Sequence, residues 1–194
     1  MAEGLSSCKI LFTMEHRLRL QPIEKPKSLY VQLGYWYFKK MIGKVITPAK
    51  VVYARVPKLM KVASLFYKIS EQAPLSDDLK IMIHALVSDL NGCAFCIDIT
   101  QAYAIHKGSS LKKLGELHNF ATSELFSPAE RACLTYVKEV TLHKQVPDEV
   151  FRELQQHFSE EKIIYITFLA ASEAYYNTVN LALGIGSDGL CALQ

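Results

Sequence analysis

Two cysteines separated by two residues are the part of this sequence best suited to chemistry, in the segment Cys93-Ala94-Phe95-Cys96. Asn91-Gly92 comes directly before the pair and ends one predicted helix, so the first cysteine begins the next helix. At the first turn of a helix, unpaired backbone amides and the helix dipole favour a thiolate over a thiol. One helical turn also brings the two sulfur atoms close enough for a disulfide. The spacing therefore predicts a redox pair that moves two electrons in each turnover.

Two other uses of the cysteine pair have to be weighed. Zinc needs about four ligands, usually with a second Cys or His pair at fixed spacing, and the sequence offers no such second pair. Two buried, unreactive cysteines are the other alternative. The remaining cysteines (Cys8, Cys133 and Cys191) lack the spacing of a secreted disulfide framework. We expect Cys8 and Cys133 to be packing or bystander thiols, and we expect neither a metal nor a cofactor.

Side chains near the pair could move protons during thiol chemistry. Thr100 follows Cys96 by four residues, so its hydroxyl lies on the same helical face as the sulfur atoms. On the preceding helix, His84 and Ser88 form a polar stripe on an otherwise apolar element. A histidine ionises near neutral pH and is a credible base. The alternative for His84 is a structural role in a hydrogen bond.

A second polar stripe lies on the last predicted helix, where Glu173, Tyr176, Asn177 and Asn180 recur at positions i, i+3, i+4 and i+7. A buried polar stripe is costly unless its members bond to one another or serve a site. We hypothesise that Glu173 supplies a carboxylate to the cysteine pair and that Tyr176 supports it. Hydrogen bonds between helices or subunits are the alternative. Asp98 lies well round its helix from Cys96, so we expect at most a supporting role for it.

Helical periodicity and capping residues predict an all-α fold without strands. A segment at 1–27 shows no sustained period and is predicted to be an N-terminal arm, followed by one helical domain at 28–194. The helices are expected at 29–41, 48–56, 59–72, 77–90, 93–107, 128–144 and 160–183. We expect the helix at 77–90 to be almost wholly buried.

The glycine-rich segment Gly184-Ile185-Gly186-Ser187-Asp188-Gly189 matches a dinucleotide-binding fingerprint in its letters alone. That fingerprint needs a strand before it and a helix after it, whereas this segment follows a helix. It is interpreted as a terminal turn that docks Leu190 and Cys191 on a neighbour.

Composition restricts the partners. Half of the residues are hydrophobic and 21% are charged, which is a low charge content for a solitary domain and favours a homo-oligomer. Aromatic residues at 30 and 35–38 are expected in the core or in a subunit contact, with a pocket wall as the alternative.

The net charge of +3 comes from scattered Lys and Arg residues, so we expect no nucleic-acid partner. The apolar run at 163–171 is too short to span a membrane, and the poor secretory signal at the start predicts a cytoplasmic location.

The segment Leu90-Asn91-Gly92-Cys93-Ala94-Phe95-Cys96-Ile97-Asp98 resembles the core motif of the carboxymuconolactone decarboxylase family, in its alkylhydroperoxidase D-like branch. The resemblance covers roughly residues 45–185 and implies a single-domain helical bundle assembled as trimers or hexamers. It implies a thiol-dependent peroxidase or disulfide oxidoreductase of antioxidant defence, with a peroxide or disulfide substrate and a thiol protein or small thiol as reductant. It also implies that Cys96 attacks and Cys93 resolves, whereas helix position alone favours Cys93 as the attacking thiol.

The sequence departs from that branch where the family places a proton relay. The family's relay glutamate falls on Ile81 and its relay histidine on Thr100. The relay therefore has to come from other residues, and the candidates are His84, Thr100, Glu173 and Tyr176. Two further functions stay open: a lactone decarboxylase or isomerase without a redox role, and a non-catalytic redox-sensing assembly module.

Overall fold

The structure is a computed structural model, and it describes residues 17–190 of the chain. Within that range every regular element is a helix, which confirms the predicted all-α class. The elements are α1 (Leu29–Ile42), the π-helical turn η1 (Ala49–Tyr53), α2 (Pro57–Gln72), α3 (Asp77–Leu90), α4 (Ala94–Lys107), α5 (Leu111–Gly115), the short 3-10 helix η2 (Leu117–Asn119), α6 (Pro128–His143), α7 (Asp148–His157) and α8 (Glu160–Ala182).

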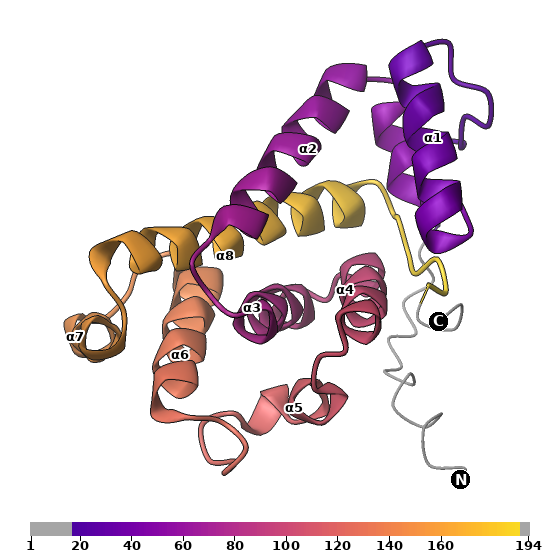
Figure 1. The fold of residues 1–194 in the computed structure, drawn as a ribbon. Coiled ribbons are helices and arrows are strands. Elements are labelled where there is room, and N and C mark those ends of the chain that lie inside the picture. Colours follow the sequence, from indigo (N-terminus) through magenta and orange to yellow (C-terminus); the bar gives the residue numbers. More distant parts are fainter. Residues whose placement is uncertain (1–16, 191–194) are drawn as a thin grey trace, which may run out of the picture.

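Helix α3 is the central element of the bundle and packs against α4, α6 and α8 (Figure 1). Ser76 caps its first turn, because the serine hydroxyl accepts the Leu79 N–H at 3.2 Å. Ile83 and Val87 have no exposed surface. Eight of its 14 residues are buried, which is less than the almost complete burial predicted, and Ser88 among them is a polar side chain held away from water.

Capping residues set several helix boundaries as the sequence predicts. Ser127 and Glu130 form a capping box at the start of α6, with N–H to oxygen distances of 2.8 and 3.2 Å. Ser159 accepts the Lys162 N–H at 3.4 Å and begins α8. Gly108 takes the left-handed conformation that ends α4. These local signals place the ends of α6, α8 and α4 within about one residue of the predicted positions.

Other elements were missed or misplaced. Helix α7 was not predicted, because Leu154 is its one fully buried residue and its apolar residues are few: Val150, Phe151 and Leu154. The short α5 and η2 also escaped prediction. Helix α2 begins at Pro57, two residues before the predicted start, and the segment before it is a π-turn and not the α-helix expected there.

Helices α1 and α2 project from the rest of the bundle (Figure 1). No residue of α2 is buried, and α1 buries only Val31, Gly34 and Tyr35. Large apolar side chains are exposed on both helices, including Leu29, Leu33, Trp36, Tyr37, Met41, Leu65 and Tyr67. Of the aromatic residues predicted for the core or a subunit contact, Tyr35 lies in the core, while Trp36 is 63% exposed.

The described part of the predicted arm, residues 17–27, contains no helix and lies along the domain. The Arg19 N–H donates to the Leu183 carbonyl at 3.0 Å, and the Ile23 N–H donates to the Lys50 carbonyl at 3.1 Å. Among residues 17–190, no helix combines the length and the apolar character that a membrane crossing requires.

Candidate functional site

Cys93 and Cys96 are joined as a disulfide at the start of α4. Gly92, with φ of +68°, makes the turn out of α3 that places Cys93 at the N-cap. The Cys93 N–H donates to the Ser88 carbonyl at 2.9 Å, which ties the pair to the end of α3. The two Cα atoms are 5.3 Å apart, within the ordinary range for a disulfide. The structure thus brings together the two residues that the sequence singled out.

The disulfide is buried in an apolar cluster, with 0% of Cys93 and 2% of Cys96 exposed. Its other members come from α1, the segment around η1, α4 and the C-terminal turn, and they include Val31, Ile46, Val51, Phe95, Ile185 and Leu190. Water and ions are excluded from such a cluster, so each hydrogen-bond donor near sulfur has a larger effect than it would at the surface.

Within the described residues, each sulfur atom accepts one hydrogen bond. The Cys96 backbone N–H donates to Cys93 Sγ at 3.4 Å, which is the stabilisation expected at a helix N-terminus. Asn180 of α8 donates through Nδ2 to Cys96 Sγ, also at 3.4 Å. Sequence reasoning placed Asn180 on the polar stripe of α8 but assigned it no contact with sulfur. The signal available was its position two turns after Glu173.

Glu173 makes three hydrogen bonds, two to α3 and one within α8. Its Oε2 lies 3.0 Å from His84 Nδ1, and its Oε1 accepts bonds from Ser88 Oγ at 2.8 Å and Asn177 Nδ2 at 2.7 Å. The side chain of Glu173 is 10% exposed and that of His84 is 22% exposed. A buried carboxylate is thereby connected to a histidine that reaches the solvent. The two polar stripes of the sequence face each other.

The network continues toward the cysteine pair. Asn177 accepts a hydrogen bond at its Oδ1 from Asn91 Nδ2, at 2.8 Å. Asn91 is the C-cap of α3 and lies two residues before Cys93. Glu173 itself hydrogen bonds to neither sulfur atom in the described part of the chain. The carboxylate therefore lies one layer of side chains behind the disulfide.

The other relay candidates lie elsewhere. Thr100 is buried on α4, and its hydroxyl hydrogen bonds neither to the described Glu173 network nor to a sulfur atom. Tyr176 packs against Tyr175 and Phe66, with ring centroids 5.3 and 6.2 Å away. Burial, followed by the proximity of Tyr53 and Glu173, raises the pKa of Tyr176, so the phenol stays protonated at neutral pH. Ile81, at the family's glutamate position, is 2% exposed in the core.

Asp98 holds the C-terminal turn against α4. Its Oδ2 accepts hydrogen bonds from Ser187 Oγ at 2.8 Å, from the Asp188 N–H at 2.9 Å and from the Leu190 N–H at 3.0 Å. The Asp188 carboxylate in turn accepts the Thr47 N–H and hydroxyl, both at 2.7 Å. Leu190 is fully buried in the cluster that contains the cysteines. The expectation that it docks on a neighbour is corrected, because Asp98 draws it into its own chain.

The remaining cysteines differ from the pair. Cys133 is fully buried between α6 and its neighbours, which fits the predicted packing thiol. Burial, with a smaller contribution from Glu130, raises the pKa of Cys133. Cys8 and Cys191 lie outside the described residues. Across residues 17–190, no three His, Cys, Asp or Glu side chains gather as metal ligands would.

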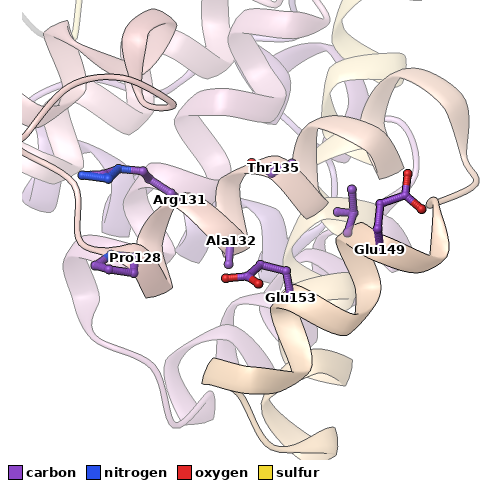
Figure 2. A pocket seen from close by; sticks show the side chains of 7 residues that line it. Pro128, Arg131, Ala132, Thr135, Glu149 and Glu153 are labelled. Carbon is purple, nitrogen blue, oxygen red and sulfur yellow. The ribbon is translucent and has the colours of Figure 1, made fainter.

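A cavity of about 380 Å³ lies between α6 and α7 and is separate from the disulfide (Figure 2). Its lining includes Arg131 and Thr135 of α6 and Glu149 and Glu153 of α7. Helix α3 stands between these two helices and α4 (Figure 1). The cavity is therefore not an entrance to the sulfur atoms.

No protein-family model matches the chain. It is 29% identical to the uncharacterized protein YdfG of Bacillus subtilis over 134 residues, which covers 68% of this chain and 91% of that protein. It is 26% identical to the uncharacterized protein YnjA of Escherichia coli over 177 residues, covering 90% and 96% of the two chains.

Three solved structures share the fold. A protein of unknown function from Agrobacterium tumefaciens, described as an antioxidant defence protein of the AhpD type, has a TM-score of 0.66 and 26% identity, covering 71% of this chain and 96% of its own. A peroxidase-related protein from Silicibacter sp. TM1040 has a TM-score of 0.75 and 18% identity, covering 89% and 93%. A cysteine-to-alanine variant of the debrominase Bmp8, in complex with 2,3,4-tribromopyrrole, has a TM-score of 0.78 and 19% identity, covering 93% and 97%.

Fold and site together define an all-helical, single-domain protein with a buried Cys-x-x-Cys disulfide at a helix N-terminus. Its fold is that of the alkylhydroperoxidase D-like branch of carboxymuconolactone decarboxylase-like proteins, and the resemblance read from the sequence is confirmed. The solved neighbours include proteins named for enzymatic activities, among them the debrominase, so the fold carries more than one activity.

Proposed function

We propose that this chain is a thiol-dependent peroxidase or thiol-disulfide oxidoreductase whose redox centre is the Cys93–Cys96 pair. The observation that carries the proposal is the disulfide itself, formed at the N-terminus of α4 with a hydrogen-bond donor at each sulfur atom. The fold shared with the AhpD-type protein of Agrobacterium tumefaciens supports a role in antioxidant defence.

The proposed cycle begins with the reduced dithiol. The Cys96 thiolate attacks the terminal oxygen of a hydroperoxide, so that a sulfur–oxygen bond forms and the oxygen–oxygen bond breaks. The departing alkoxide takes a proton and leaves as an alcohol. Cys93 then attacks the sulfenic sulfur of Cys96, the disulfide forms and the hydroxide leaves as water once it is protonated. Two electrons have passed from the cysteines to the peroxide.

A second dithiol closes the cycle. The thiolate of a reductant protein, or of a small thiol, attacks the disulfide and forms a mixed disulfide, and a second thiol of the reductant resolves it. With a disulfide substrate in place of a peroxide, the same exchange runs in the opposite direction. Both variants need only the two cysteines as electron carriers.

Glu173 and His84 are proposed as the proton reservoir that replaces the family's relay. The cycle releases one proton from each thiol and consumes one proton each as the alcohol and the water leave. Glu173 is buried and hydrogen bonded to Ser88 and Asn177, while His84 reaches the solvent. The contacts connect bulk water to the end of α3, where the cysteine turn begins. Thr100 and Tyr176, which lie outside this network, are second choices for the relay.

The decisive experiment measures reversible oxidation and turnover together. Reduced protein is mixed with hydrogen peroxide or cumene hydroperoxide in the presence of dithiothreitol, and peroxide loss is followed for wild type, Cys93→Ser and Cys96→Ser. We expect turnover in wild type, and its loss in both variants. Thiol-blocked mass spectrometry on the same samples should show the wild-type pair gaining and losing a disulfide.

The same samples separate the alternative functions. A redox sensor oxidises reversibly without consuming peroxide catalytically. A lactone decarboxylase or isomerase keeps its activity in both serine variants. Because a debrominase has this fold, a brominated pyrrole belongs in the substrate panel. A pair that stays reduced and unreactive under excess oxidant would refute the proposed function.

We also propose that the chain forms a homo-oligomer through α1 and α2. Both helices expose large apolar side chains, and α2 buries none of its residues in the chain. Trp36→Glu places a charge on this face without disturbing the core, so it should shift the protein from oligomer to monomer in size-exclusion chromatography with light scattering. Lys138→Glu, an exposed change on α6, is the matched control. A trimer or hexamer, and the cytoplasmic location, stay predictions from the sequence.

A further inference from the structure

Asn180 is the one side chain in residues 17–190 that hydrogen bonds to a sulfur atom of the pair. It is 4% exposed and lies on α8, an element remote in sequence from the cysteines. Its carbonyl accepts the Ile185 N–H at 2.9 Å, so the turn that follows α8 fixes its backbone. A buried amide of this kind is costly unless its donors find partners. Here the partner is Cys96 Sγ, at 3.4 Å.

The two sulfur atoms receive donors of different origin. Cys93 Sγ accepts a backbone N–H, which any sequence at this helix terminus would supply. Cys96 Sγ lies one turn further along α4 and depends on the side chain of Asn180. Without that amide, the apolar cluster would disfavour a charge on Cys96 while the helix terminus still favoured one on Cys93.

Building on the proposed function, we propose that Asn180 is a positioning residue that stabilises the Cys96 thiolate and so allows Cys96 to be the attacking thiol. A hydrogen bond to an ionised acceptor is roughly twice as strong as one to a neutral acceptor. The bond therefore strengthens when the disulfide is reduced and Cys96 ionises. It favours the reduced pair over the oxidised pair and favours attack by Cys96 over attack by Cys93.

Site-resolved alkylation of the reduced protein tests this role. Iodoacetamide is reacted over a pH series, and fragment-ion mass spectrometry quantifies labelling at Cys93 and Cys96 separately. Asn180→Leu has a similar volume and no donor, so Cys96 labelling near pH 7 should slow about tenfold, while Cys93 labelling stays unchanged. The difference should narrow as the pH rises, because the thiolate fraction then increases in both proteins. Asn119→Asp, at an exposed site in η2, should match wild type.

A second readout is the equilibrium of the pair with a thiol redox buffer. A tenfold weaker stabilisation of the thiolate should make the reduction potential about 30 mV more negative in Asn180→Leu. Asn180→Asp keeps the shape and places a negative charge at sulfur, and it should slow Cys96 labelling at least as much. This variant keeps the test valid if Asn180→Leu does not fold.

The inference fails if Cys96 labelling is unchanged in both variants, or if both cysteines slow equally, since that would be a general structural effect. Alkylation needs no peroxide turnover, so the two proposals fail separately. If Cys96 labelling is slower in the Asn180 variants while wild type consumes no peroxide, the role of Asn180 is upheld and the peroxidase is refuted. If wild type consumes peroxide while Cys96 labelling is the same in all variants, the peroxidase is upheld and the role of Asn180 is refuted.

Discussion

Cys133 and Cys96 are buried to almost the same degree, in two different apolar clusters of one small bundle, with 0% and 2% of their surfaces exposed. No described residue donates a hydrogen bond to Cys133 Sγ, and burial raises the pKa of that thiol. Cys96 has a partner sulfur one turn away and the Asn180 amide against it. Burial alone therefore does not decide whether a cysteine is reactive. The donors around the sulfur atom distinguish Cys96 from Cys133.

The cluster around Cys133 is a packing core, whereas the cluster around the disulfide borders on polar groups from α3, α4 and α8. Glu173, Asn177 and Asn180 are all buried, and each one has a hydrogen-bond partner on another element or on its own helix. Such a network is retained in a core only when its members are satisfied.

Removing the carboxylate of the polar network should have the largest effect. Glu173→Gln keeps the shape but cannot take up a proton, so we expect peroxide turnover to fall about 100-fold, a usual loss for a positioned acid or base. Cys96 alkylation should change much less. Glu161→Gln, at the exposed start of the same helix, is the control for peroxide consumption. Unchanged turnover in Glu173→Gln would assign the network a structural role.

Removing the charge that holds the C-terminal turn should have an intermediate effect. Asp98→Asn weakens three hydrogen bonds to residues 187–190, and we expect a loss of about 2 kcal/mol in the free energy of unfolding by urea. Because Leu190 belongs to the cluster around the disulfide, dithiothreitol should also reduce the pair faster. Ser187→Ala, which removes one of the three donors, should give a smaller change in both measurements.

The smallest effect concerns Cys133 and its dependence on pH. The unfolded thiol ionises near about pH 8.5, whereas burial raises the pKa of Cys133 in the folded chain. The unfolded state therefore binds fewer protons above that pH, and stability falls as pH rises. Relative to Cys133→Ala, wild type should lose up to about 1.4 kcal/mol for each pH unit above 8.5, in urea unfolding of the oxidised protein. If the free energy of unfolding depended on pH in the same way in the two proteins, Cys133 would ionise as readily in the folded state as in the unfolded state.

Local signals in the sequence predicted the elements well where a cap and a strong period coincide. Ser76, Ser127 and Ser159 begin α3, α6 and α8 because their hydroxyls accept the first free amides. Helix α7 has no capping side chain, because Pro147 stands at its N-cap, and its apolar stripe is short. The π-turn of η1 could not be predicted from the sequence, because its hydrogen-bond pattern depends on how the chain packs and not on a residue pattern.

The sequence predicted the main residues of the site but not the contacts between them. The cysteine pair, His84 and Glu173 were each named from helical spacing, but the contact between the last two depends on how α3 and α8 pack. Periodicity shows which face of a helix is polar and says nothing of the rotation at which two such faces meet. For the same reason, the sequence did not predict the contact between Asn180 and Cys96. Nor did it predict the three hydrogen bonds by which Asp98 holds the C-terminal turn.

The C-terminal turn, residues 185–190, forms one side of the cluster around the disulfide. Ile185 and Leu190 line the cluster around the disulfide, while the groups proposed for proton and electron transfer stand on α3, α4 and α8. Under the proposed function, substitutions confined to residues 185–190 should change access to the disulfide while they leave those groups in place. A small library at this segment, screened against peroxides of graded bulk, would test whether the turn governs which peroxides reach the disulfide.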